Sequence, residues 1–232
     1  MFRKRMRFKH FYFLLFLLFS MTSCIEIFDD LTLHNDGTGT FKYNVNLSAS
    51  RLKINSILAL DSLNGEKIPT VTEIQDEIER IKKLLDVKEG ITNVKVENNF
   101  DDFIFKFQCD FQSITALEKA IKSIIESEGL VKNLENMPEK WFLWEENKFQ
   151  RIIPNVILKN QRNLNASEIA ELSNGKYTSV TRFDRIINTF DNENAKLSAS
   201  KTAIMLQTNI YALILDARLL ENTIQLNQIN KQ

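Results

Sequence analysis

The sequence predicts an α+β fold, in which a largely antiparallel sheet of hairpins is covered by several amphipathic helices. Short segments that alternate apolar and polar residues are separated by tight-turn residues, which is typical of half-buried strands in hairpins. Between them lie segments with an apolar residue at every third or fourth position, which indicate helices. The 232 residues are 44% hydrophobic and 26% charged, a composition typical of a globular protein with a packed core.

The first residues are interpreted as a targeting segment that precedes the fold. Five basic residues at positions 3 to 9 are followed by an apolar run from Phe11 to Phe19. The run is shorter than the roughly 20 residues that cross a bilayer as a helix. It is followed by Ser20 to Ser23, which lie immediately before Cys24. We therefore expect a signal peptide over residues 1–23.

The stretch from Met21 to Cys24 resembles a bacterial lipobox. In that motif a signal peptidase cuts before a cysteine that already carries a diacylglyceryl group. The usual pattern has leucine three positions before the cysteine, where this chain has Met21, an apolar side chain of similar size. The resemblance implies that Cys24 is lipidated and is the first residue of the mature protein. The alternative is an ordinary secretory signal in which Cys24 is incidental.

Residues 24–30, which start at the lipidation site, are expected to form an acidic tether that contains Glu26, Asp29 and Asp30. Residues 31–232 are expected to form a single α+β domain, because their number is within the usual range for one domain. A helical excursion is expected at about residues 48–87.

The first part of the domain alternates between hairpins and helices. Asp36-Gly37 is a strong signal for a tight hairpin turn. The clearest amphipathic helix follows Pro69, where Thr70 and Glu73 have capping-box spacing. The predicted elements are strands from Leu31 to Leu33 and Phe41 to Leu47, helices within Ser48 to Leu63 and after Pro69, strands from Ile91 to Glu97 and Phe103 to Phe111, and a helix from Thr115 that stops at Gly129.

The second part begins with a predicted hairpin from Trp141 to Ile153, which has Glu146-Asn147 at a charged, exposed tip. The apolar segment from Ala203 to Leu215 is too short and too interrupted by polar residues to span a membrane, so we interpret it as a buried strand and helix. The remaining predicted elements are a helix from Asn165 to Ser173, strands from Tyr177 to Phe190 and Lys201 to Thr208, a helix from Ile210 to Arg218 and a strand from Leu219 to Asn227.

No catalytic residue, metal ligand set or cofactor site is predicted. After removal of the signal peptide His34 is the only histidine, whereas zinc sites usually need several histidine or cysteine ligands. A Ser-His-Asp triad would have to use His34, and no Gly-x-Ser-x-Gly elbow is present. Cys109 shares a strand face with four phenylalanines, so we expect a core cysteine rather than a reactive one.

His34 opens the motif His-Asn-Asp-Gly-Thr-Gly-Thr, whose residue types occur in phosphate-binding loops, calcium-binding loops and hairpin turns. A dinucleotide fingerprint needs a third glycine before a helix, and here a strand follows instead. A calcium loop needs acidic or carbonyl ligands that continue over about twelve residues, but no acidic residue follows Asp36 until Asp61. The motif is therefore interpreted as a hairpin turn.

Other short patterns have mostly structural interpretations. The carboxylate pairs Asp29-Asp30, Asp101-Asp102 and Glu145-Glu146 are expected to be solvated, although a hydrolase could use such groups. Asp61-Ser62-Leu63 fits a short bacterial O-glycosylation pattern at Ser62, and Asn165-Ala166-Ser167 is interpreted as a helix cap. The aromatic residues between Trp141 and Phe149 are expected in the core rather than on a platform for a sugar or peptide.

Two stretches resemble uncharacterised lipoproteins of the Bacteroidota. The first is Cys24 followed by the hairpin from Leu31 to Phe41, and the second is Asn192 to Ala203, which resembles a closing pattern of these proteins. In the second stretch Glu193 stands in place of the usual proline. The resemblance implies export, lipidation and an α+β domain of unknown activity, and it carries over no functional residues.

These observations predict a lipid-anchored cell-envelope protein that is a non-enzymatic binding or scaffolding module. The alternatives are a carrier of a hydrophobic ligand or lipid and a hydrolase that uses carboxylates. Its expected partners are the membrane, through the N-terminal lipid, and an unidentified envelope protein or ligand. The outer membrane is favoured over the inner one. The net charge of zero becomes acidic when the basic leader is removed, which argues against nucleic acid as a partner.

Overall fold

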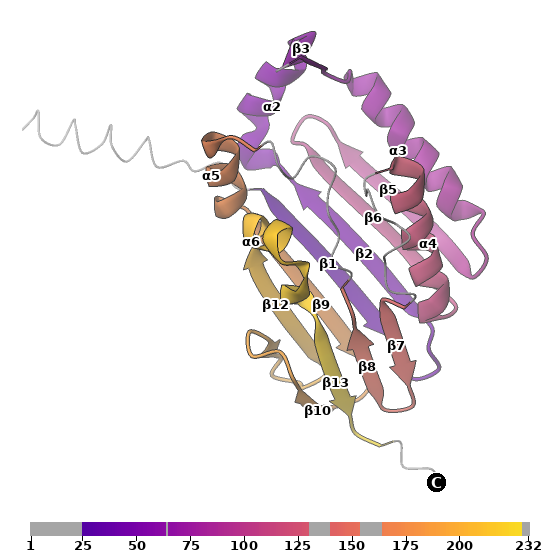
Figure 1. The fold of residues 1–232 in the computed structure, drawn as a ribbon. Coiled ribbons are helices and arrows are strands. Elements are labelled where there is room, and N and C mark those ends of the chain that lie inside the picture. Colours follow the sequence, from indigo (N-terminus) through magenta and orange to yellow (C-terminus); the bar gives the residue numbers. More distant parts are fainter. Residues whose placement is uncertain (1–24, 64, 130–139, 154–163, 229–232) are drawn as a thin grey trace, which may run out of the picture.

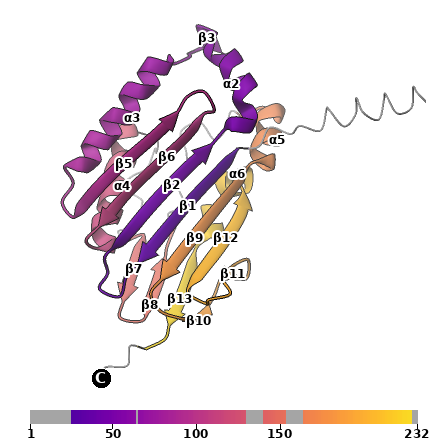
Figure 2. The same cartoon turned by 180° about the vertical axis from the view of Figure 1, so that it is seen from behind.

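The computed structural model describes residues 25–63, 65–129, 140–153 and 164–228. The described chain forms a larger and a smaller β-sheet together with several helices, so the predicted α+β class is confirmed. Figure 1 shows the smaller sheet and α4 on one face of the larger sheet. In Figure 2 the opposite face of the larger sheet is turned toward the viewer, and no described helix crosses its central strands.

The larger sheet has seven strands in the order β11-β12-β9-β1-β2-β6-β5. The pairing of β1 with β9 is parallel, and all other pairings are antiparallel. The bounds are β1 (Glu26–Leu33), β2 (Gly39–Asn46), β5 (Ile91–Asn99), β6 (Ile104–Phe111), β9 (Lys176–Phe183), β11 (Lys196–Leu197) and β12 (Ala203–Asn209).

The smaller sheet has four antiparallel strands in the order β10-β13-β8-β7. Its bounds are β10 (Ile187–Phe190), β13 (Asn222–Leu226), β8 (Lys148–Arg151) and β7 (Phe142–Glu145). A separate two-stranded hairpin is formed by β3 (Ser62–Leu63) and β4 (Glu66–Lys67). The division of the hairpins between separate sheets was not predicted from the sequence.

The longer helices begin at capping residues. The Thr70 and Asn165 side chains form capping boxes with Glu73 and Glu168, which satisfies backbone N–H groups that lack a partner in the first turn. Gly129 ends α4 in the left-handed conformation, as predicted. The helices are η1 (Ser48–Ser50), α2 (Arg51–Leu58), α3 (Val71–Asp86), α4 (Ile114–Glu128), α5 (Ala166–Asn174), α6 (Ile210–Leu215) and η4 (Ala217–Leu220).

The core lies between the two sheets and beneath α4. Phe149 of β8 is fully buried and stacks on Phe142, with ring centroids 6.1 Å apart. Its ring also meets Phe183 of β9 edge to face at 5.7 Å, which joins the smaller sheet to the larger one. The buried residues of this cluster come from both sheets and from α3 and α4: Leu31, Leu33, Leu85, Ile91, Cys109, Phe111, Ile114, Leu117, Ala120, Phe149, Phe183, Ile187, Ile204, Ile224 and Leu226.

Most predicted elements are confirmed, with changes in their limits. Ser48 to Leu63 contains a shorter helix, because α2 ends at Leu58 and the chain then enters β3. The strand expected from Tyr177 to Phe190 is divided into β9 and β10, which belong to different sheets. The interpretation of Ala203 to Leu215 as a strand and a helix is confirmed by β12 and α6.

The predicted acidic tether is wrong for residues 26–30, which belong to β1. This strand lies between β2 and β9 and is paired on both sides from Glu26 to Leu33. Asp29 faces the core together with Leu31 and Leu33, whereas a tether would leave its carboxylate in water. The strand begins earlier than expected because Asp29 finds buried partners on neighbouring strands.

Candidate functional site

The N-terminal end of the described chain is fixed to the larger sheet. Cys24 and the predicted signal peptide lie outside the described residues. The backbone oxygen of Ile25 accepts a hydrogen bond from the Lys176 backbone N–H at 2.7 Å, and β1 begins at the next residue. The first strand of the larger sheet therefore begins two residues after Cys24.

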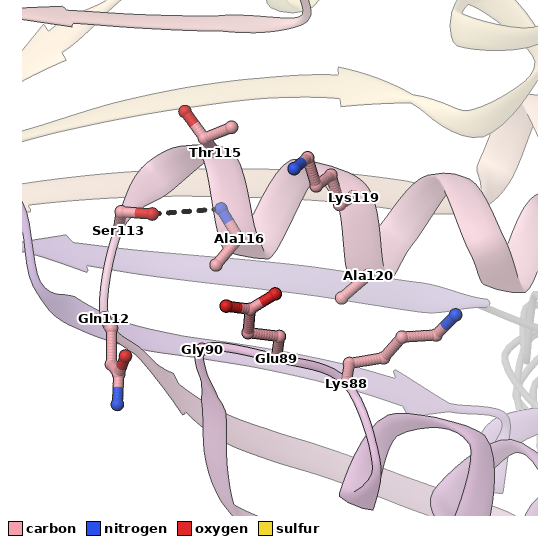
Figure 3. Close-up of a pocket in the computed structure, with 9 residues that line it drawn as sticks. All are labelled: Lys88, Glu89, Gly90, Gln112, Ser113, Thr115, Ala116, Lys119 and Ala120. Carbon is pink, nitrogen blue, oxygen red and sulfur yellow. Dashed lines mark hydrogen bonds between the residues drawn. The ribbon is translucent and has the colours of Figure 1, made fainter.

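A cleft of about 390 Å³ lies between the turn that follows α3 and the first two turns of α4 (Figure 3). Gly90 permits this arrangement, because its φ of +77° is left-handed and an added Cβ would lie 2.8 Å from the Ala116 Cβ. The Gln112 backbone N–H donates to the Gly90 oxygen at 2.8 Å, which holds the turn beside the helix. The lining residues are Lys88, Glu89, Gly90, Gln112, Ser113, Thr115, Ala116, Lys119 and Ala120.

The lining of this cleft combines charged and polar side chains with the apolar surface of Ala116 and Ala120. Its charged groups are those of Lys88, Glu89 and Lys119, and Figure 3 shows the Glu89 carboxylate directed toward α4. The Ser113 hydroxyl accepts a hydrogen bond from the Ala116 backbone N–H at 3.2 Å, so it caps the helix. The sequence did not reveal this cleft, because the turn at Gly90 and the start of α4 meet only through packing in the folded chain.

A second polar cluster is buried between the two sheets and centres on Asp29, which is 1% exposed. Arg151 of β8 reaches across and donates to both carboxylate oxygens at 3.2 and 3.4 Å. The hydroxyls of Tyr177 and Ser179 on β9 donate to the same carboxylate at 2.6 and 2.7 Å. These hydrogen bonds compensate the loss of hydration of a buried charge pair. The cluster therefore links the two sheets.

The space beside this cluster is small. The cavity there is about 10 Å³, and its lining includes Arg151 and Asn222, which are paired on neighbouring strands. The Arg151 Nε and Asn222 Nδ2 atoms have no protein hydrogen-bond partner. A cavity of this size has room for about one water molecule, so it does not accommodate an apolar ligand.

Tyr43 faces Asp29 from the neighbouring strand, and this arrangement makes the fold sensitive to high pH. Burial, followed by the negative charge of Asp29, raises the pKa of Tyr43 from 10.0 to about 12. A raised folded-state pKa means that the tyrosine contributes full stability below pH 10 and loses it as the pH rises toward 12. We expect the unfolding free energy to fall in this window, and Tyr43→Phe to reduce the fall. Urea unfolding at increasing pH measures both; an identical pH dependence in the two proteins would contradict the assignment.

The residues around the predicted hairpin lie as expected. Gly37 has a φ of +85°, and the Thr38 backbone N–H and hydroxyl donate to the Asp36 carboxylate. The Thr38 hydroxyl, and then its backbone N–H, lower the pKa of Asp36. The His34 Nδ1 lies 3.1 Å from the Asp184 carboxylate, so this surface histidine ties the hairpin to the turn after β9. The hairpin interpretation of the motif is confirmed.

The other residues noted in the sequence lie in ion pairs, exposed turns or helix caps. Asp102 pairs with Arg51 at 3.2 Å in the turn between β5 and β6, and Glu145 and Glu146 are exposed at the β7-β8 hairpin. Asn165 caps α5, as predicted. Ser62 is exposed in β3, and its glycosylation stays a prediction. Within the described ranges, no three histidine, cysteine, aspartate or glutamate side chains converge on a common point.

Cys109 is a core residue, as expected, with 1% of its surface exposed. Burial, and then the charge of Asp110, raise the pKa of the thiol from 9.0 to about 12. Because the thiolate is the reactive form of cysteine, the folded protein keeps this group unreactive near neutral pH.

The fold and these sites define an α+β protein with a buried polar link between two sheets and an open polar cleft. No protein-family model and no curated protein matches the chain. The fold is similar to the folded domain of LppM from Mycobacterium tuberculosis, solved by NMR, with a TM-score of 0.38 and 8% identity over 90% of this chain and 93% of that one. This low likeness carries no functional argument. In the part of the chain that the structure describes, every helix is too short or too polar to cross a bilayer.

Proposed function

We propose that the protein is a lipid-anchored cell-envelope protein that acts as a non-enzymatic binding or scaffolding module. The observation that carries this proposal is the lipobox-like stretch that ends in Cys24, directly before a strand that begins at Glu26. The lipid on Cys24 would attach the fold to the membrane, with the outer membrane favoured over the inner one.

The position of β1 supports cleavage before Cys24. This strand is central in the larger sheet, with β2 on one side and β9 on the other. A cut within Glu26–Leu33 would remove backbone partners from both neighbours, and a cut after Asp29 would also remove its buried carboxylate. A processing site that preserves the sheet must therefore precede Glu26, and Cys24 meets this condition.

The binding or scaffolding role is supported by the hydrogen bonds and the burial of the side chains that could otherwise react. The Asp29 carboxylate is occupied by Arg151 and two hydroxyls, and the Cys109 thiol is enclosed. The cleft beside α4 is lined by lysine, glutamate and serine side chains that suit polar contacts. Its serine, Ser113, caps a helix instead of facing a histidine.

The test of the anchor is Cys24→Ser in the full chain. We expect this variant to lose incorporation of a fatty-acid probe and to leave the membrane fraction, because a serine hydroxyl does not become the thioether. Cys109→Ser is the matched control, and it should keep both the probe and the membrane association, since Cys109 is buried in the core. Continued labelling of the Cys24→Ser protein would refute the lipidation site.

A further inference from the structure

The segment from residue 51 to residue 63, which we name the apolar arm, projects from the fold without a buried side chain. It contains α2 and β3, and all of its residues are half-buried or exposed. Its large apolar side chains include Leu52, Leu60 and Leu63, which are 79%, 47% and 40% exposed. Figures 1 and 2 both show α2 and β3 extending beyond the end of the larger sheet.

The exposed leucines of the apolar arm are not buried in the core, so packing of the core does not account for them. Single exposed leucines are ordinary, but several in one projecting segment indicate a contact surface. The arm is held at its base by polar contacts, because Lys53 pairs with Glu171 of α5 and Arg51 pairs with Asp102. Both ion pairs lie near the start of α2, whereas Leu60 and Leu63 lie beyond its end.

The apolar arm begins at the same end of the sheet as the attachment point. Glu26 at the start of β1 is opposite Asn46 at the end of β2, and α2 starts shortly after Asn46. Gly175, which follows α5, lies against Ile25, and Glu171 of α5 pairs with Lys53 of the arm, so the end of α5 lies close to both the start of β1 and the arm. Figure 1 shows α2 and α5 together at this end.

The chain between Cys24 and β1 is too short to separate the fold from the membrane. Two extended residues span about 7 Å, and α2, with its eight residues, is about 12 Å long. If Cys24 carries its lipid at the bilayer surface, this end of the sheet must lie against the headgroups. At that end the apolar arm presents the exposed side chains of Leu52, Leu60 and Leu63.

We propose that the apolar arm lies on the lipid bilayer and inserts Leu60 and Leu63 into the interface between headgroups and acyl chains. This inference rests on the proposed lipidation of Cys24. Apolar side chains on such surface segments enter this interface, while neighbouring charged groups stay in the headgroup region. The arm then fixes how the domain is oriented: the hairpin at His34 and the turn after β9 face away from the membrane.

The experiment uses the lipidated full-length protein in vesicles of phosphatidylethanolamine and phosphatidylglycerol. A polarity-sensitive fluorophore is attached through Leu60→Cys or, in a matched control, through Ile186→Cys. The two native side chains are 47% and 45% exposed, but Ile186 follows the far end of β9, whose eight residues span about 25 Å. Cys109 is buried and Cys24 is a thioether in the lipidated protein, so neither competes for the label.

We expect the label at position 60 to shift its emission to the blue and to be quenched several-fold more strongly by lipids brominated on the upper acyl chain than the label at position 186. In a second pair of variants, the label is placed at Leu52→Cys. Leu60→Asp with Leu63→Asp should abolish its quenching, and Ile186→Asp should leave it unchanged.

Equal quenching at positions 60 and 186 would overturn the proposal for the apolar arm. A label at position 60 that is protected in native membranes but not in vesicles would also overturn it, in favour of a protein partner. The mass of the purified protein separates these results from a failure of the anchor. A chain without the diacylglyceryl mass would refute the lipidation of Cys24, whereas a lipidated chain with equal quenching would refute only the docking of the arm.

Discussion

Asp29→Ala is expected to lower the unfolding free energy by about 3–5 kcal/mol, because it leaves the Arg151 guanidinium buried without its counter-charge. The substitution also leaves the Tyr177 and Ser179 hydroxyls without their acceptor. Because the cluster joins the two sheets, both sheets should be destabilised together and should unfold in a single transition. Urea unfolding followed by circular dichroism measures the change.

The neighbouring residue provides the control for Asp29→Ala. Asp30 points to the opposite face of β1 and pairs with Arg182, and their side chains are 13% and 49% exposed, compared with 1% and 13% for Asp29 and Arg151. Asp30→Ala should therefore cost less than Asp29→Ala, because the guanidinium that it leaves without a partner stays in contact with water. Asp29→Leu combined with Arg151→Met should recover most of the stability lost by Asp29→Ala, because apolar residues of similar volume remove both charges. Equal costs for the two alanine variants would show that burial does not govern the energy of the Asp29 pair.

Gly39→Ala is the other change with a large expected effect, a loss of about 3 kcal/mol in unfolding free energy. An added Cβ at position 39 would lie 2.0 Å from the Thr32 carbonyl oxygen and 2.5 Å from the Phe111 Cζ atom. The first of these atoms is backbone in the central strand, so the clash cannot be relieved by a side-chain rotation. Differential scanning calorimetry of the purified variant measures the loss.

Gly65→Ala separates this clash from backbone strain. Gly65 has a φ of +85°, but its Cβ would meet no atom within 4 Å. Its expected cost is about 1 kcal/mol, which is the penalty for a left-handed alanine. If Gly39→Ala were as mild as Gly65→Ala, the close approach of β1, β2 and β6 at Gly39 would be wrong.

Local signals in the sequence predicted two helix caps and a tight turn correctly. The Thr70 and Asn165 capping boxes depend on residues three positions apart, and they form as expected. The Asp36-Gly37 turn likewise depends on the conformational freedom of one glycine, Gly37. Such features need no knowledge of distant parts of the chain.

The buried polar cluster and the cleft could not be predicted, because they depend on contacts between distant residues. The sequence favours a tether at Asp29 because charged side chains are mostly exposed and this one lies close after Cys24. Its partners Arg151 and Ser179 follow more than a hundred residues later. The signal that was present is the alternation of Asp29, Leu31 and Leu33, which predicts a shared strand face once Asp29 is allowed to be buried.

The parallel pairing of β1 with β9 has a consequence for the order in which the protein can fold. β1 is the first element of the described chain, yet one of its two neighbours, β9, lies about 150 residues later in the sequence. Contacts of such long range form slowly, because a large loop must close first. During emergence of the chain from its N-terminus, β1 can pair with β2 early, but its other edge stays open until Lys176–Phe183 has emerged. Completion of the sheet, and with it the burial of the Asp29 face of β1, is therefore a late event in biosynthesis.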